Sequence, residues 1–149
     1  MDIQSMAKKF NFNVCGTESL RTVFTAQSKA YFYCREAVCE FVFSKGMLPV
    51  NPFMAFDYFL GDRADRDLIR RANNQLISMC DELWVFGDIA NGVMFEIMLV
   101  KNLKKPIRYF TIAARSHEIA EVTLSDLPFE AEMALTREQI DEFIATVNL

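Results

Sequence analysis

Short apolar segments alternate along the chain with longer segments whose apolar positions recur at helical spacing. The apolar segments predict strands at residues 22–26, 47–50, 82–86 and 107–112, with a fifth strand near residues 121–124. The segments with helical spacing predict helices over residues 30–44, 63–79 and 92–103. The TREQ sequence of residues 136–139 has the form of a capping box and predicts the start of a terminal helix.

Strands that alternate with helices favour an open, doubly wound, parallel α/β sheet of about five strands flanked by helices, of the Rossmann-like or flavodoxin-like type. Residues 82–86, ELWVF, are mostly apolar without alternation, as expected of a central strand buried on both faces. Residues 51–62 are predicted to form a loop that is rich in aromatic residues and folds back over the body.

The composition fits one domain spanning residues 1–149, because 52% of the residues are hydrophobic and 24% are charged. The net charge of -4 argues against a protein that grips the phosphates of a nucleic acid polymer. Residues 111–149 carry two basic and eight acidic side chains, so most of the excess acidity lies there. No apolar stretch is long enough to span a membrane and no signal peptide is evident, so we expect a cytoplasmic protein without a membrane partner.

The four cysteines and the one histidine do not form a recognisable metal or catalytic motif. Cys15, Cys34, Cys39 and Cys80 lack CxxC spacing, and His117 lies far from all of them in sequence. We therefore expect free, buried thiols, a histidine on the surface, and no metal or organic cofactor.

In a doubly wound sheet, ligands bind at the carboxyl ends of the strands, where the strand order reverses. The candidate residues are therefore Gln27 and Ser28 after the first strand, residues 51–57 after the second, residues 88–96 after the third, and Thr111 onward after the fourth. Neither GxGxxG nor GxxxxGK[ST] occurs, so the usual phosphate-binding signatures are absent. Phosphate has an alternative site at the start of the predicted helix, on the amides of residues 92–94.

Glu96 stands out among these residues as the one ionisable side chain between Asp88 and Lys101. With Asn91 as N-cap, it would lie near the first turn of an apolar helix, where burial and the helix N-terminus together would tune its ionisation. Such a carboxylate suits nucleophilic or acid–base chemistry. The alternative is an ordinary acidic residue at the start of a helix, and the residues alone leave both interpretations open.

Residues 80–110, CDELWVFGDIANGVMFEIMLVKNLKKPIRYF, resemble the central motif of the nucleoside 2-deoxyribosyltransferase-like family. The matching features are Asp81, the strand of residues 83–86, Gly92 with Glu96, and the Lys-Pro step at residues 105–106. The resemblance extends over about residues 21–112. It implies a single domain of that family, with cleavage or transfer at the N-glycosidic bond of a nucleoside or nucleoside 5'-monophosphate.

The resemblance further implies that Glu96 is the nucleophile and forms a covalent glycosyl-enzyme intermediate, which water or a second base resolves. The sequence departs from the family where a carboxylate is usual and Asn73 stands, and where Asp or Ser is usual and Ala90 stands. The family's tyrosine near the end of the first strand falls near Phe24. The predicted substrate-binding residues are Gln27, Asp57, Asn73, Asp88, Asn91, Gly92 and Met94.

The family commonly forms homodimers or larger assemblies in which a neighbour's C-terminal region completes the site, and here Ser125 or Asn148 would supply that residue. The expected partners are thus a small nucleoside or nucleotide and a second copy of the chain. The departures at Asn73 and Ala90 keep a second hypothesis open, a non-catalytic nucleotide-binding module of the same fold.

Overall fold

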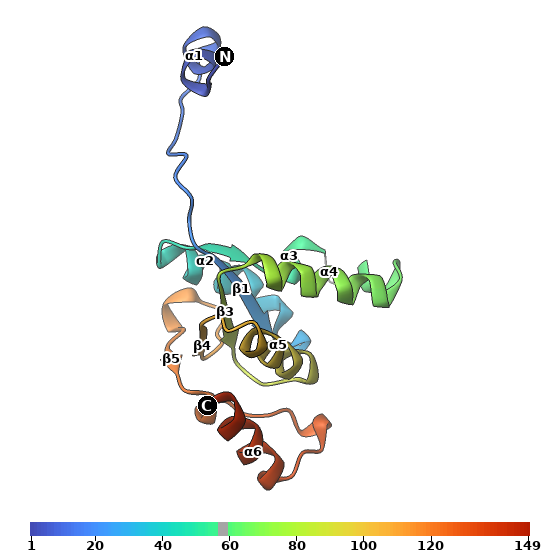
Figure 1. Cartoon of the computed structure of the whole chain (residues 1–149). Coiled ribbons are helices and arrows are strands. Elements are labelled where there is room, and N and C mark those ends of the chain that lie inside the picture. The colour runs from blue at the N-terminus through green and yellow to red at the C-terminus, as the bar shows by residue number, and fades with distance from the viewer. Residues whose placement is uncertain (57–59) are drawn as a thin grey trace.

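The strands of the computed structural model form a five-stranded sheet in the order β2-β1-β3-β4-β5 (Figure 1). The structure describes residues 1–56 and 60–149. The strands are β1 (Thr22–Gln27), β2 (Leu48–Val50), β3 (Glu82–Phe86), β4 (Ile107–Phe110) and β5 (Glu121–Val122). The first four pair in parallel, and the order reverses between β1 and β3. This arrangement confirms the predicted α/β fold and is the flavodoxin-like strand order.

β5 departs from the predicted parallel arrangement because it pairs antiparallel with β4, through Tyr109 with Val122 and Phe110 with Glu121. Between β4 and β5 the chain forms only a short 3₁₀ helix, η3 (Ser116–Glu118). A parallel crossover needs a connection of a dozen or more residues, usually with an α-helix. The chain between Phe110 and Glu121 is too short for that crossover, so the last strand runs back along the edge.

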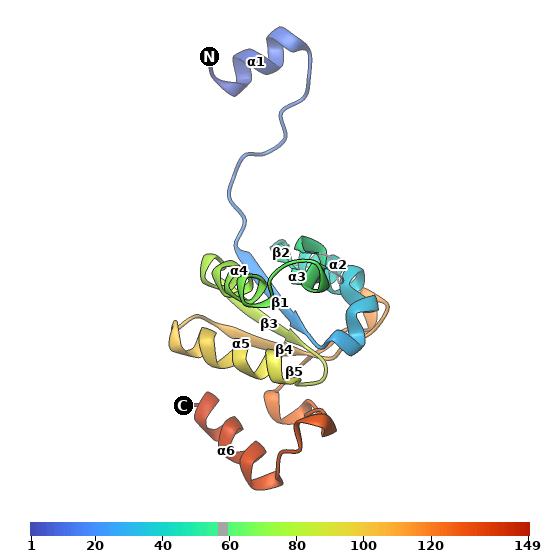
Figure 2. The same ribbon diagram turned by 90° about the vertical axis from the view of Figure 1, so that its right-hand side faces the viewer.

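Helices cover both faces of the sheet, as Figure 2 shows from the side. The α-helices are α1 (Ile3–Phe10), α2 (Arg35–Ser44), α3 (Pro52–Ala55), α4 (Arg66–Met79), α5 (Asn91–Asn102) and α6 (Arg137–Val147). On one face, Phe41 of α2 packs with Trp84, which is fully buried as predicted. On the other face, Ile77 of α4 and Ile97 of α5 pack with Leu83, and α6 covers the same cluster.

Two predicted segments begin differently in the structure. The segment predicted as a helix over residues 30–44 starts as a 3₁₀ helix, η1 (Lys29–Cys34), with a non-helical kink at Tyr31 before α2 begins. The segment predicted as a loop over residues 51–62 contains α3, capped by the Asn51 side chain, and a 3₁₀ turn, η2 (Leu60–Asp62). Asp57, a predicted binding residue, lies outside the described residues.

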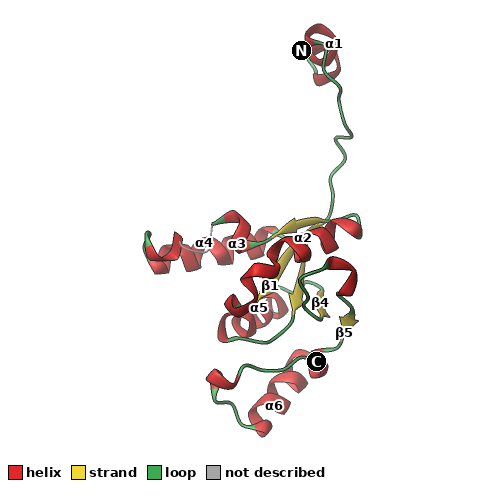
Figure 3. Cartoon of the chain, turned by 180° about the vertical axis from the view of Figure 1, so that it is seen from behind, coloured by secondary structure: helices red, strands yellow, loops and turns green. Residues whose placement is uncertain are grey.

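The N-terminal helix α1 was not predicted, although Ile3, Met6 and Phe10 have helical spacing. Its N-cap is Asp2, whose side chain accepts a hydrogen bond from the backbone of Ser5 at 2.8 Å. An extended segment separates it from the sheet in all views, as Figure 3 shows from behind. In the described part of the chain, no helix is long and apolar enough to cross a membrane.

All four cysteines are free thiols, as predicted. Cys34 and Cys80 are buried and Cys39 is half-buried, but Cys15 is exposed because it lies in the extended segment after α1. The expectation of burial is therefore wrong for Cys15. His117 lies on the surface, with 74% of its side chain exposed, as predicted.

Candidate active site around Glu96

Glu96 is buried in the second turn of α5, with only 9% of its surface exposed. The helix starts one residue earlier than predicted, because Ala90 is the N-cap and Asn91 is the first helical residue. Glu96 is therefore in the second turn, where the helix N-terminus acts more weakly than it does in the first. Burial dominates instead and raises the pKa of Glu96 to about 7.

Asn73 of α4 is the hydrogen-bond partner of this carboxylate. Its Nδ2 donates to Glu96 Oε2 at 3.0 Å, and this bond opposes part of the pKa rise caused by burial. α4 and α5 pack side by side on the same face of the sheet, which brings the two side chains together across 23 positions of sequence. A carboxamide thus holds Glu96 in place without adding a second negative charge.

Glu96 lines a pocket of about 1000 Å³ at the carboxyl ends of β1 and β3. The predicted residues Gln27, Ser28, Asn73, Asn91 and Gly92 also line it. Its other lining residues are Lys29, Ala30, Pro52, Phe53, Phe56, Ile69, Arg70, Asn74, Ala90, Val93, Phe95, Glu130, Glu132 and Met133. The structure therefore brings most of the residues named from the sequence together around one cavity.

Asp88 and Met94, predicted to bind substrate, do not line the pocket. Met94 packs against the hydrophobic core, because two residues along a helix correspond to a rotation of roughly 200° away from Glu96. The Asp88 carboxylate faces the Tyr31 hydroxyl at 3.5 Å. Burial, with the nearby Glu130 carboxylate as a second cause, raises the pKa of Asp88.

Gln27 lines the pocket, but both ends of its side-chain amide already form hydrogen bonds within the protein. Gln27 Nε2 donates to the carbonyl of Tyr31 at 2.7 Å, and Gln27 Oε1 accepts from Asn51 Nδ2 at 2.9 Å. Asn51 Nδ2 also donates to Thr25 Oγ1 at 2.9 Å, while Asn51 Oδ1 accepts from the backbone of Phe53. These hydrogen bonds hold the Gln27 side chain in place, so Gln27 shapes the site more than it offers a free donor.

The wall formed by Glu130, Glu132 and Met133 was not predicted from the sequence. This segment has no regular hydrophobic period, and it reaches the site by pairing with the turn after β3. Ile89 donates its backbone N–H to Pro128 at 2.8 Å, and Glu130 donates its own to Ile89 at 2.9 Å. The Ser28 hydroxyl donates to Glu130 Oε1 and ties the wall to the end of β1. Ser125 and Asn148 were expected to reach the site from a neighbouring copy of the chain, and this remains a prediction.

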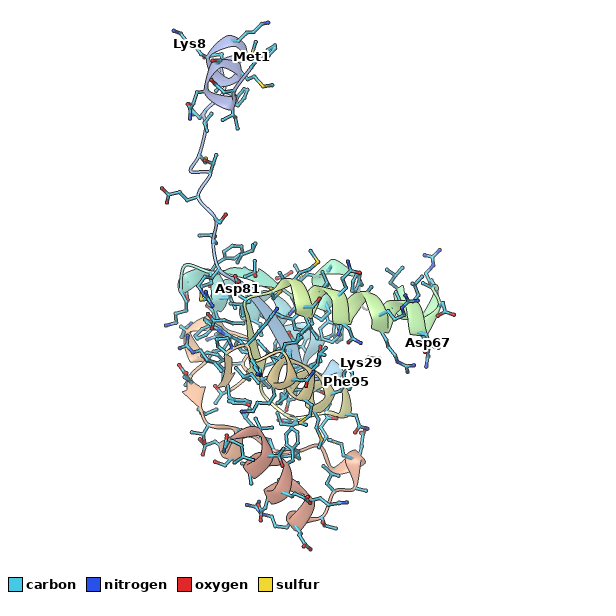
Figure 4. The ribbon with its side chains drawn as sticks, in the orientation of Figure 1. Met1, Lys8, Lys29, Asp67, Asp81 and Phe95 are labelled. Atoms are coloured by element: carbon cyan, nitrogen blue, oxygen red, sulfur yellow. The ribbon has the colours of Figure 1, made fainter. Side chains whose placement is uncertain are left out.

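The pocket combines aromatic walls with charged groups of both signs. Phe53 and Phe56 come from the segment after β2, and Phe95 comes from α5. Figure 4 labels Phe95 together with Lys29, a cationic residue of the pocket lining. Among the described residues, no group of His, Cys, Asp or Glu gathers in a way that could hold a metal ion.

The chain matches, over residues 22–110, a family described as a domain of unknown function, DUF7768. Because this match spans more than half of the chain, the protein belongs to that family. The matched region runs from the start of β1 to the end of β4 and includes Gln27, Asn73 and Glu96. The wall around Glu130 lies outside it.

No curated protein matches the chain. Among solved structures, a 2-deoxyribosyltransferase from Leishmania mexicana is similar to it, with 17% sequence identity and a TM-score of 0.48. The similarity covers 84% of this chain and 97% of the other.

Proposed function

We propose that this domain cleaves or transfers the N-glycosidic bond of a nucleoside, with Glu96 as the nucleophile. The observation that carries the proposal is a buried carboxylate with a pKa of about 7 on the wall of a pocket of about 1000 Å³. Burial of a carboxylate is unfavourable for folding, and a site that shifts a pKa this far in a cavity is typical of acid–base or nucleophilic chemistry. The resemblance of residues 80–110 to nucleoside 2-deoxyribosyltransferases supports the same assignment.

In the first step, a carboxylate oxygen of Glu96 bonds to C1 of the sugar while the bond from C1 to the base nitrogen breaks. The electron pair of that bond leaves with the base, which takes a proton from water. The negative carboxylate stabilises the oxocarbenium-like charge that develops on the sugar. In the second step, water or another base attacks C1 while the bond from C1 to Glu96 breaks, Glu96 leaves as a carboxylate, and the attacking group gives a proton back to the hydroxide left by the first step.

Other groups of the pocket suit the remaining parts of a nucleoside. The aromatic walls of Phe53, Phe56 and Phe95 offer faces on which a base can stack. Asn73 holds the carboxylate by its hydrogen bond to Oε2, which leaves Oε1 for the sugar carbon. Asn91 and Asn74 add neutral polar groups that suit sugar hydroxyls or base edges.

The test is release of free base from a panel of ribo- and deoxyribonucleosides and their 5'-monophosphates, followed by chromatography with and without an acceptor base. We expect the wild-type chain to release base from at least one substrate. Glu96→Gln, which keeps the size of the side chain, and Glu96→Ala are expected to lower the rate at least ~1000-fold. Intact-protein mass spectrometry after rapid quenching is expected to show the sugar bound to wild type and absent from Glu96→Gln.

A matched control is Glu138→Gln, which removes a carboxylate from the exposed surface of α6 away from the pocket. Full activity of Glu96→Gln would contradict the proposed mechanism. Nucleosides that bind the wild type without any release of base would instead support the non-catalytic binding module.

A further inference from the structure

The charged side chains that line the pocket differ in their exposure and in the hydrogen bonds that hold them. Among the described residues, the carboxylates of Glu96, Glu130 and Glu132 line it, together with the cationic Lys29 and Arg70. Arg70 is exposed and its guanidinium donates to Asp67 at 3.0 Å, so its charge is balanced on the surface of α4. Lys29 is also exposed, and water therefore screens its charge.

Glu130 differs from the exposed groups because both its backbone and its side chain are held in place. Its backbone N–H donates to Ile89 at 2.9 Å, and its Oε1 accepts a hydrogen bond from Ser28. The side chain is half-buried, and its charge is close enough to Asp88 to raise the pKa of that residue. Hydrogen bonds thus hold the Glu130 carboxylate in place, close to the carboxylate of Asp88.

We propose that Glu130 makes the pocket selective for uncharged nucleosides over their 5'-monophosphates, and that its carboxylate accepts a hydrogen bond from a sugar hydroxyl. This inference rests on the proposed function of the Glu96 site and names the substrate class that the site takes. Gln27 is held by Tyr31 and Asn51, and Asn73 is held by Glu96, so these amides are already engaged. No hydrogen bond to Glu130 Oε2 is found among the described residues, so this oxygen can accept one from a sugar hydroxyl.

A phosphate monoester brings about two negative charges into the same pocket at neutral pH. Glu132, Lys29 and Arg70 are all exposed, so water screens their charges, whereas the half-buried carboxylate of Glu130 is screened less and repels the phosphate more strongly. A neutral nucleoside does not meet this repulsion. The pocket therefore favours the nucleoside.

The experiment compares kcat/KM for each 2'-deoxynucleoside of the panel with that for its 5'-monophosphate, in wild type, Glu130→Gln and Glu130→Ala. We expect wild type to prefer the nucleoside at least tenfold. Glu130→Gln removes the charge and keeps an acceptor oxygen, so the preference is expected to fall about tenfold. Glu130→Ala also removes the acceptor and is expected to raise KM for the nucleoside about tenfold.

Glu138→Gln on α6 is the matched control and is expected to leave the ratio within twofold of wild type. A wild-type preference for the monophosphate, or an unchanged ratio in Glu130→Gln, overturns the inference while leaving the role of Glu96 intact. If no substrate releases base, the proposed function fails, and calorimetric Kd values for the same pairs of ligands test the selectivity alone. Absence of binding to every member of the panel overturns both proposals.

Discussion

At the scale of single residues, two opposing effects act on Glu96. Burial disfavours its charged form, and the hydrogen bond from Asn73 favours it. Burial is the larger effect, so the pKa of Glu96 lies at about 7. A nucleophilic carboxylate must be ionised, and near neutral pH this site is poised between its two protonation states.

The rate of base release is accordingly expected to rise with pH and to level off above a midpoint near 7, the pKa of Glu96. Asn73→Ala removes the hydrogen bond that lowers this pKa, so the midpoint should move upward by about one pH unit. Asn74→Ala, which changes the neighbouring pocket residue, is the control. The pH dependence of kcat/KM measures this midpoint. If the midpoint is the same in Asn73→Ala as in wild type, Asn73 is not a positioning residue for Glu96.

The same pKa also predicts how stability changes with pH. Folding raises the pKa of Glu96 from 4.5 to about 7, so the folded state binds a proton more tightly than the unfolded chain. Stability is therefore lost as pH rises from 4.5 through 7, by up to about 3 kcal/mol. Glu96→Gln cannot ionise, and it should be more stable than wild type at pH 8 and nearly equal to it at pH 4.

Urea unfolding at the two pH values measures this difference, with Glu138→Gln as the control for loss of an exposed carboxylate. Equal stability of Glu96→Gln and wild type at pH 8 would mean that the carboxylate is hydrated in solution. A gain in stability together with a loss of activity is the pattern expected of a functional site that folding alone does not favour.

At the scale of elements, the turn after β3 positions both the pocket and its C-terminal wall. Gly87 has a φ of +76°, which residues with a side chain rarely adopt, and its N–H donates to Phe110 at 2.9 Å. A Cβ at this position would overlap the Ile112 side chain, with Ile112 Cβ only 2.8 Å away. This close approach locks the start of the turn against the segment that follows β4.

Gly87→Ala is therefore expected to destabilise the fold by about 2–4 kcal/mol, because it combines an unfavourable φ with a steric overlap. Gly46 offers a matched control, since it has the same φ of +76° but no atom within 4 Å of the Cβ that a substitution would add. Gly46→Ala should cost only about 1 kcal/mol. Chemical unfolding of the two variants compares them, and equal losses would exclude the contact with Ile112 as a source of destabilisation.

At the scale of the whole molecule, α1 is separate from the body, which consists of the sheet and the helices packed on it. Among the described residues, the two hydrophobic clusters that hold the sheet and its helices together contain no residue of α1. Phe10 on α1 is 62% exposed, whereas Phe143 on α6 is 7% exposed and belongs to the core. The stability of the domain should therefore be independent of the apolar face of α1.

We expect Phe10→Ser to change the free energy of unfolding by less than about 0.5 kcal/mol. Phe143→Ala, which empties a buried position, should cost about 3–5 kcal/mol. Urea unfolding followed by circular dichroism makes the comparison. A loss above about 1 kcal/mol in Phe10→Ser would show that α1 packs against the body in solution.

Most of the fold could be predicted because its signals are local. β3 was predicted with its exact ends, since residues 82–86 are an apolar segment bounded by turn residues. The capping box of Thr136 and Gln139 starts α6 as expected. The start of the helix that carries Glu96 was predicted one residue too late, because the N-cap is Ala90, which has no capping side chain.

The site could be predicted only in part, because its contacts join distant parts of the chain. The pairing of Asn73 with Glu96 depends on how α4 packs beside α5, and the approach of Glu130 depends on its pairing with Ile89. Neither interaction has a periodic signal in the sequence.

The sequence by itself determined the order of strands and helices, the strand ends where the pocket lies, and the choice of Glu96, because these follow from local periodicity and from the isolation of one charge among apolar neighbours. Tertiary structure alone decided that Glu96 is buried with a pKa of about 7, that the Gln27 side chain is hydrogen-bonded within the protein, and that Glu130 lines the pocket. The physical reason is that desolvation and hydrogen bonding depend on which groups packing brings together, and packing joins residues that the sequence keeps far apart.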